Sequence, residues 1–285
     1  MARNTLLFHL SDIHFGLEDN EALDWVQAEI AAKRPATVAI TGDLTMRARD
    51  REFAAACDWI RALDAPVTVE IGNHDMPYFN LVERFFAPYR RFRAIEGLIE
   101  REIDLPGVAI VPLKTAVRAQ PRFNWSKGWV SRSALRKCLA AIDALPHGTK
   151  ALVAVHHPLR EVGTKGTALT VNGKRALTEL ARRPVVGVLS GHVHDPFDIL
   201  EDTSAGPVRM IGAGTLSQRL RSTPPSFNEL SWDGETLTVR VRNLAEVPTP
   251  EMQIDDVPEN ALPPREIGEP VAPIHQVPRT DPPVH

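Results

Sequence analysis

The sequence predicts an α/β fold built on two mixed β-sheets, and three observations support this prediction. Short apolar runs alternate with stretches of helical periodicity in the first part of the chain, which is typical of parallel strands joined by crossover helices. From Asp198 onward the pattern changes to short strands, which we expect to add antiparallel strands to a second sheet. Polar residues follow several apolar runs, at the sheet edge where open α/β folds bind ligands.

The individual elements follow from the spacing of apolar residues. Short apolar runs bounded by polar residues, Gly or Pro predict strands at 5–10, 37–41, 67–71, 108–113, 151–155 and 185–189. Helical spacing predicts helices at 20–33, 50–63, from Pro77 through Phe86, at 131–145 with Ser131 or Ser133 as the cap, and at 174–182. Four later strands are expected at 199–201, 208–211, 227–231 and 236–241, and the Asp233-Gly234 turn joins the last two as a hairpin.

Composition divides the chain into a body, residues 1–245, and a tail, residues 246–285. The chain has 285 residues, 43% of them hydrophobic, which is enough for a sizeable core. The tail contains 10 of the 24 prolines and eight acidic against two basic residues, a net charge of −6, so we expect it to be extended or disordered. Since the whole chain carries −3, the body carries about +3, which suits a small anionic substrate but not stable binding of duplex nucleic acid.

The chain shows no sign of a membrane span or of a disulfide framework. No uninterrupted apolar run approaches the roughly 20 residues that a transmembrane helix requires. The first residues lack a secretory pattern, because the apolar run Leu6-Leu7-Phe8 is too short. Cys57 and Cys138 both fall in predicted helices. These features predict a cytoplasmic location.

Five predicted strands end at residues that are common metal ligands. Two histidines at i and i+2 past a strand tip can point the same way in extended chain. The candidate ligands are Asp12, His14, Asp43, Asn73, His156, His192 and His194. Seven nitrogen and oxygen ligands are too many for one tetrahedral ion, so they favour two ions that share one carboxylate. The mixed imidazole and carboxylate set suits Mn, Fe or Zn better than Ca or Mg.

These residues resemble the successive signatures of the calcineurin-like metallophosphoesterases. The signatures are D-x-H, G-D, G-N-H-D, a histidine at a strand end and G-H-x-H, and the resemblance extends over roughly residues 4–243. The chain has them in this order, as Asp12-Ile13-His14, Gly42-Asp43, Gly72-Asn73-His74-Asp75, His156 and Gly191-His192-Val193-His194. Because His156-His157-Pro158 matches H-H-P, the chain looks most like the branch of class III cyclic nucleotide phosphodiesterases and glycerophosphodiesterases.

The resemblance implies a fold and a role for each motif residue. The expected fold is a four-layer α/β/β/α sandwich with two mixed sheets and a dinuclear metal centre at their shared edge. The first divalent ion would be held by Asp12, His14 and His194, the second by Asn73, His156 and His192, and Asp43 would bridge them. His74 would bond a phosphoryl oxygen and act on the leaving alcohol. Asp75 either orients His74 or holds the turn.

The resemblance also implies an activity, with several alternatives left open. The expected reaction is hydrolysis of a small anionic phosphodiester, of the cyclic nucleotide or glycerophosphodiester type, by a hydroxide generated on the metals. The alternatives are a phosphomonoesterase or nucleotide pyrophosphatase, a nuclease, and a non-catalytic scaffold. Retention of every ligand argues against the scaffold. A homodimer is also left open.

Other polar and aromatic residues have less specific signals. His157 is expected to support the site rather than to ligate a metal directly. Trp125 and Trp129 either stack on a base or belong to the core. His9 and His147 are expected to be structural. Four basic residues near the motifs either contact the substrate or are solvated surface charges; these are Arg160, Lys165, Arg219 and Arg221.

Overall fold

The computed structural model describes residues 4–77, 80–99 and 105–246, which form two five-stranded sheets and their helices. The first sheet has the strand order β10-β9-β1-β2-β3, and the second has the order β4-β5-β6-β8-β7. The strands are β1 (Thr5–Leu10), β2 (Thr37–Ile40), β3 (Val67–Val69), β4 (Val108–Pro112), β5 (Lys150–Ala154), β6 (Val185–Ser190), β7 (Phe197–Thr203), β8 (Gly206–Gly212), β9 (Ser226–Trp232) and β10 (Leu237–Asn243). The helices are α1 (Asn20–Lys33), α2 (Asp50–Ala62), α3 (Leu81–Phe86), α4 (Arg93–Ile99), α5 (Arg132–Asp143), α6 (Gly173–Leu180) and a final 3-10 turn, Leu244–Glu246.

Both sheets are mixed, as the sequence predicts. In the first sheet β1, β2 and β3 are parallel, whereas β9 pairs antiparallel with both β1 and β10. In the second sheet β4, β5, β6 and β8 are parallel, and β7 pairs antiparallel with β8. The parallel strands place their carboxyl ends at one edge of each sheet, where ligands bind in folds of this kind.

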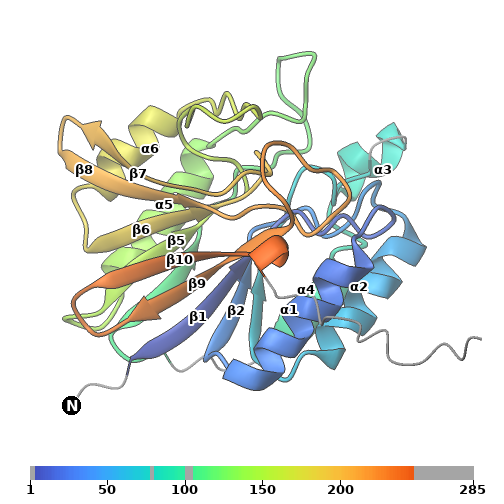
Figure 1. Ribbon diagram of the computed structural model, residues 1–285. Coiled ribbons are helices and arrows are strands. Elements are labelled where there is room, and N and C mark those ends of the chain that lie inside the picture. Colours follow the sequence, from blue (N-terminus) through green and yellow to red (C-terminus); the bar gives the residue numbers. More distant parts are fainter. Residues whose placement is uncertain (1–3, 78–79, 100–104, 247–285) are drawn as a thin grey trace, which may run out of the picture. The chain divides into compact units, whose positions relative to one another are not determined.

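The sheets pack face to face between two helical layers (Figure 1). One core lies between the first sheet and helices α1, α2 and α4, and another lies between the second sheet and helices α5 and α6. A third core, between the sheets, buries Leu7 and Leu230 of the first sheet against Leu152, Leu189 and Ile211 of the second. The predicted four-layer α/β/β/α sandwich is therefore confirmed.

The later strands differ from the prediction that they would all extend the second sheet. Only β7 and β8 do so, whereas the β9–β10 hairpin returns to the first sheet and pairs with β1. Phe227 of β9 stacks against Phe8 of β1 and Trp25 of α1, with ring centroids 4.8 and 5.0 Å apart. An alternating pattern shows that a strand has one buried face, but it does not show which sheet supplies that face.

Some element boundaries also differ from those expected. The short helix α4 was not predicted, although its Ile95 and the preceding Phe92 are buried in the core beside the first sheet. Helix α3 begins at Leu81 with Asn80 as its N-cap, later than the expected start at Pro77. The expected cap and hairpin are otherwise present: Ser131 caps α5, and a turn at Asp233-Gly234 connects β9 to β10.

The proposed tail, residues 246–285, lies outside the described residues except for Glu246, so its predicted character and boundary stay predictions. Within the described part of the chain, no helix combines the length and apolar character that crossing a bilayer requires.

The two sheets approach each other closely where β1 and β6 end. Gly191 follows β6, and a Cβ atom at this position would lie 1.7 Å from Ser11 Oγ and 2.5 Å from Asp12 Oδ2. The next residue, His192, donates its backbone N–H to Asp12 Oδ2 at 2.7 Å. Glycine is therefore required at position 191 for the two strand ends to meet.

We expect Gly191→Ala to lower the free energy of unfolding by about 1–3 kcal/mol, because the added methyl group must push the two strand ends apart. Urea denaturation measures this change. The control is Gly97→Ala in α4, where a Cβ atom meets nothing within 4 Å. The control should raise stability by about 0.5–1 kcal/mol. Equal stability of Gly191→Ala and the natural chain would contradict the close packing of the sheets.

Candidate metal centre

All five motifs lie at the carboxyl ends of parallel strands. Asp12 and His14 follow β1, Asp43 follows β2 and Asn73 follows β3. The second sheet contributes the residues after β5 and β6; these are His156, His157, His192 and His194. The backbone joins neighbouring motifs, since Asp12 N donates to Gly42 O at 3.1 Å and Gly191 N donates to His156 O at 3.0 Å. Strands far apart in sequence thus present polar side chains to one place.

A first group of side chains consists of Asp12, His14 and His194, all buried. His194 Nε2 lies 3.2 Å from Asp12 Oδ1 and 3.2 Å from His14 Nε2, and His14 Nε2 lies 3.6 Å from Asp12 Oδ1. One carboxylate oxygen and two imidazole nitrogens therefore face a common point.

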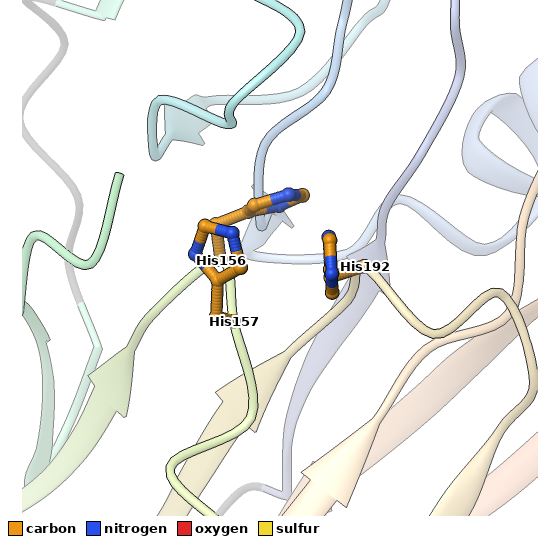
Figure 2. Close-up of side chains that lie close together, drawn as sticks. All are labelled: His156, His157 and His192. Atoms are coloured by element: carbon orange, nitrogen blue, oxygen red, sulfur yellow. The ribbon is translucent and has the colours of Figure 1, made fainter. Parts of the chain in front are cut away.

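A second group contains His156, His157 and His192, which Figure 2 shows with their rings close together. The ring centroids of His157 and His192 are 4.4 Å apart. The side-chain amide of Asn73 completes the group: its tip lies 3.1 Å from His156 Nε2, 3.1 Å from His192 Nδ1 and 3.2 Å from His157 Nε2.

Asp43 lies between the two groups. Its Oδ2 is 4.0 Å from His14 Nε2 in the first group and 3.3 Å from His156 Nε2 in the second. Its other oxygen accepts a hydrogen bond from the backbone N–H of His74 at 2.8 Å. One carboxylate oxygen thus faces ligand atoms of both groups.

Five of the seven predicted ligands have a left-handed backbone. The φ angles are 53° for Asp12, 53° for His14, 54° for Asp43, 69° for His192 and 64° for His194. Residues other than glycine rarely adopt this conformation, which costs about 1–3 kcal/mol at each position and is concentrated at functional sites. The chain at His192 and His194 is therefore not extended, contrary to the expectation from their spacing, and the two rings belong to different groups.

Backbone carbonyls fix the orientation of three rings. His156 Nδ1 lies 2.7 Å from Thr41 O, His194 Nδ1 lies 2.7 Å from Arg219 O, and His74 Nδ1 lies 2.7 Å from Met46 O. Since a carbonyl only accepts, each Nδ1 donates, and in the neutral ring Nε2 then carries the lone pair. The Nε2 atoms of His156 and His194 face the two groups described above. Metal-ligating histidines commonly have such partners.

The chemistry of the donor set fits cations. Among the residues that the structure describes, Asp12 Oδ1 is buried without a hydrogen-bond partner, and a buried polar atom in this state is costly. When Oδ1 of Asn73 occupies the amide tip, it faces His156 Nε2 and the Ser126 carbonyl oxygen, both of which offer lone pairs to a cation. With Nδ2 there instead, the amide would donate to the rings. We favour the oxygen, because a cation would satisfy the buried acceptors of both groups.

Electrostatics support the same conclusion. Burial lowers the pKa of His14 to about 4 and that of His192 to about 3, so both rings are neutral, as metal ligands must be. Burial opposes ionisation of Asp43, yet the facing histidines, His156 first among them, hold the pKa of this carboxyl well below its usual range. Burial would lower the pKa of His156, but Asp43 raises it to about 9. A divalent cation would replace that proton.

His74 and Asp75 have different surroundings. His74 lines the cavity over the two groups and is partly exposed. The carboxylate of Asp75 is buried and bonds other groups: Oδ1 accepts from Thr45 N at 2.8 Å, and Oδ2 accepts from Gly72 N at 2.9 Å. Of the two roles left open for Asp75, these bonds favour holding the turn, while the Met46 carbonyl orients the His74 ring.

His157 has protein partners at both ring nitrogens. Nδ1 lies 3.0 Å from Thr115 Oγ1, and Nε2 lies 2.9 Å from Ser126 O. Burial, followed by the neighbouring His192 and His156, holds its pKa well below the usual range, so the ring is neutral. These contacts fasten the segment 114–128 to the second group, which agrees with a supporting role.

A cavity of about 240 Å³ opens over both groups. Its lining includes Asp43, Asn73, His74, His192 and His194, together with Ser126, Lys127, Lys165, Gly166, Thr167, Arg219 and Arg221. The guanidinium of Arg219 reaches the candidate ligands, with Nη1 3.2 Å from His74 Nε2 and 3.3 Å from His14 Nε2. Sequence reasoning did not single out Lys127, and no motif marks it.

The other basic and aromatic candidates have structural partners. Arg160 pairs with Glu201, with Nε 2.8 Å from Oε1, and does not line the cavity. Trp125 donates its ring N–H to Gln120 O at 3.0 Å and stacks under Arg84. His9 is buried and contacts Thr41 and Asn228, as expected of a structural histidine.

Two solved structures share the fold. A dimetal phosphatase from Danio rerio matches with a TM-score of 0.62 at 14% identity, covering 84% of this chain and 96% of that one. A purple acid phosphatase from yellow lupin seeds matches with a TM-score of 0.65 at 12% identity, covering 86% of this chain and 52% of that one. At these identities the matches establish the fold alone.

Sequence comparison is more specific. The chain is 26% identical over 165 residues to a probable glycerophosphodiester phosphodiesterase, GpdQ, from Arcobacter nitrofigilis. That alignment covers 56% of this chain and 57% of the relative. The family model for calcineurin-like phosphoesterases matches residues 6–196, which include all five motifs. Together with the sandwich fold, this match shows that the chain belongs to the calcineurin-like phosphoesterase family.

Proposed function

We propose that the chain is a phosphodiesterase that depends on two divalent metal ions and hydrolyses small diesters of the cyclic nucleotide or glycerophosphodiester type. The observation that carries the proposal is the convergence of seven predicted ligands into two groups that share Asp43. The similarity to a probable glycerophosphodiester phosphodiesterase supports a diester substrate. We propose Mn, Fe or Zn as the metals, because the donors are imidazoles, carboxylates and one amide. The cytoplasmic location stays a prediction from the sequence.

The residues would divide between the ions as the resemblance implies. Asp12, His14 and His194 would hold the first ion, and Asn73, His156 and His192 the second. Asp43 would contact both. When bound, two such ions lower the pKa of water and neutralise charge on the phosphoryl oxygens. Two carboxylates against two divalent ions leave the centre positively charged, which favours an anionic ester.

The chain's own residues would bind and orient the ester. The diester anion would bind in the cavity beside His74 and Arg219, both of which line it and carry nitrogen atoms that can donate to a phosphoryl oxygen. With Nδ1 fixed by the Met46 carbonyl, a protonated His74 directs its Nε2–H into the cavity. We propose that this group bonds a phosphoryl oxygen and supplies the proton or the positive charge that the departing alcohol requires. Water attacks phosphorus from the side opposite that alcohol and yields a monoester.

One observation favours a phosphomonoesterase as the second candidate. Four basic residues line the cavity, Lys127, Lys165, Arg219 and Arg221, and a monoester dianion carries more charge than a diester. A non-catalytic scaffold is less favoured, because the buried ligand groups are complete.

We expect the purified chain to hydrolyse bis(p-nitrophenyl) phosphate when Mn²⁺ is supplied, and to lose this activity on treatment with a chelator. Adding Mn²⁺ back should restore the activity, because the buried ligand atoms have lone pairs that only a cation would satisfy. A parallel assay with p-nitrophenyl phosphate compares the two ester classes. A higher kcat/KM for the monoester would favour the second candidate, and absence of turnover with Mn²⁺, Fe²⁺ or Zn²⁺ would favour the scaffold.

We expect His74→Ala to retain its metals and to lose about 10²–10⁴-fold in kcat for the diester, the range typical of a general acid. Steady-state kinetics and elemental analysis of the purified variant measure the two quantities. The matched control is His147→Ala, because His147 is exposed and does not line the cavity. This variant should keep both the kcat and the metal content of the natural chain. A normal kcat in the His74 variant would refute the proposed role, and loss of metal would instead make His74 part of the metal site.

A further inference from the structure

The rim of the cavity carries two cations that have no partner among the described residues. Lys165 and Arg221 line the cavity and are exposed, and neither forms a hydrogen bond or an ion pair through its side chain with any residue that the structure describes. Several arginines elsewhere in the described part of the chain do have carboxylate partners. The ion pairs include Arg160–Glu201, Arg183–Asp143, Arg209–Asp198 and Arg242–Glu29. Lys165 and Arg221 are therefore available to bind a ligand that enters the cavity.

The loop that carries Lys165 is held against the metal-binding motifs. A Cβ atom at Gly166 would lie 2.7 Å from Val193 O and 2.8 Å from Val193 Cα, so the loop packs directly on the Gly-His-Val-His segment. Lys127 holds the same loop from the other side, with Nζ bonded to Thr167 O and 2.7 Å from Thr167 Oγ1. Glycine at position 166 therefore permits a contact that keeps Lys165 beside the site.

The segment that carries Arg221 is held in a similar way. Asp195, directly after the same motif, is buried, and its Oδ1 accepts from Ser222 N at 2.8 Å and from Thr223 Oγ1 at 3.2 Å. His194, the residue before Asp195, donates its ring N–H to the backbone carbonyl of Arg219. Both rim cations are therefore anchored through the backbone to the segment 191–195, while their side chains stay free.

The charge of the cavity exceeds what one diester phosphate requires. Among the described residues that line the cavity, Asp43 is the only carboxylate, and it faces the metal ligands rather than the rim. Arg219 already reaches the position next to His74, where the scissile phosphoryl group would bind. Lys165 and Arg221 then remain for another part of the ligand, and an ammonium and a guanidinium both bind phosphate or carboxylate oxygens well.

We propose that Lys165 and Arg221 bind a second anionic group of the substrate, a phosphate or carboxylate beyond the scissile phosphodiester. The inference rests on the proposed function for the position of the reacting phosphoryl group. The preferred substrate is then a diester with at least two separate anionic groups. Lys165 and Arg221 determine which substrate binds and do not take part in the chemical step.

A pair of chromogenic nucleotides tests this proposal. Thymidine 5′-(p-nitrophenyl phosphate) and its 3′-phosphorylated form have the same scissile diester and the same leaving group, and differ only in one additional phosphate. We expect the natural chain, loaded with Mn²⁺, to have a lower KM for the 3′-phosphorylated form. In the double variant Lys165→Gln/Arg221→Gln, this KM should rise about twofold to thirtyfold, the range for two exposed charge pairs. KM for the other form and kcat for both should change less than about twofold.

Controls separate this effect from a general loss of charge. The double variant Lys137→Gln/Arg132→Gln removes the same charges from exposed positions on α5 and should leave both KM values unchanged. Raising the salt concentration should reduce the preference for the 3′-phosphorylated form, because exposed charges are screened. Equal KM values for the two nucleotides in the natural chain, or equal effects of the rim variant on both, would overturn the proposal.

Failure of the proposed function gives a different result. If the natural chain hydrolyses neither nucleotide nor bis(p-nitrophenyl) phosphate, calorimetry with the Mn²⁺-loaded chain replaces the kinetic assay. Tighter binding of thymidine 3′,5′-bisphosphate than of thymidine 5′-monophosphate, lost in the rim variant, would support the second anionic site without the reaction. Equal affinities of the natural chain for the two ligands would overturn it.

Discussion

A single buried carboxylate joins the two halves of this structure. Asp43 follows β2 of the first sheet, yet its Oδ2 lies 3.3 Å from His156 of the second sheet and 4.0 Å from His14 of its own. Burying this charge is costly unless cations or donors surround it. The sandwich provides such surroundings, because both sheets direct the carboxyl ends of their parallel strands to the same edge. Every functional inference depends on this convergence.

The geometry of the site is held by the fold at the expense of local backbone strain. Left-handed φ angles at Asp12, Asp43 and His192 are unfavourable for residues with a Cβ atom. Such conformations persist only where the surrounding structure over-determines them, and here three apolar cores and a close contact at Gly191 do so. The loops can therefore hold ligand atoms in place without being regular structure.

Most of the fold and of the two groups of candidate metal ligands could be predicted from the sequence, for identifiable reasons. Apolar runs that end in Asp, Asn or His mark both a strand and its functional end, so Asp12, Asp43 and His192 were found without coordinates. The pairing of β9 with β1 was not predicted, because a period of two does not specify the partner sheet. Lys127 and the inward position of Arg219 lie in loops whose course depends on tertiary contacts such as Gly166 on Val193.

The central claim is that two cations bind on either side of Asp43. Crystals grown with Mn²⁺ and measured at its absorption edge test this directly, because anomalous scattering locates each ion independently of the protein atoms. The account predicts two peaks about 3.5–4 Å apart, one beside Asp12, His14 and His194 and the other beside Asn73, His156 and His192. A single peak, or peaks away from Asp43, would contradict it.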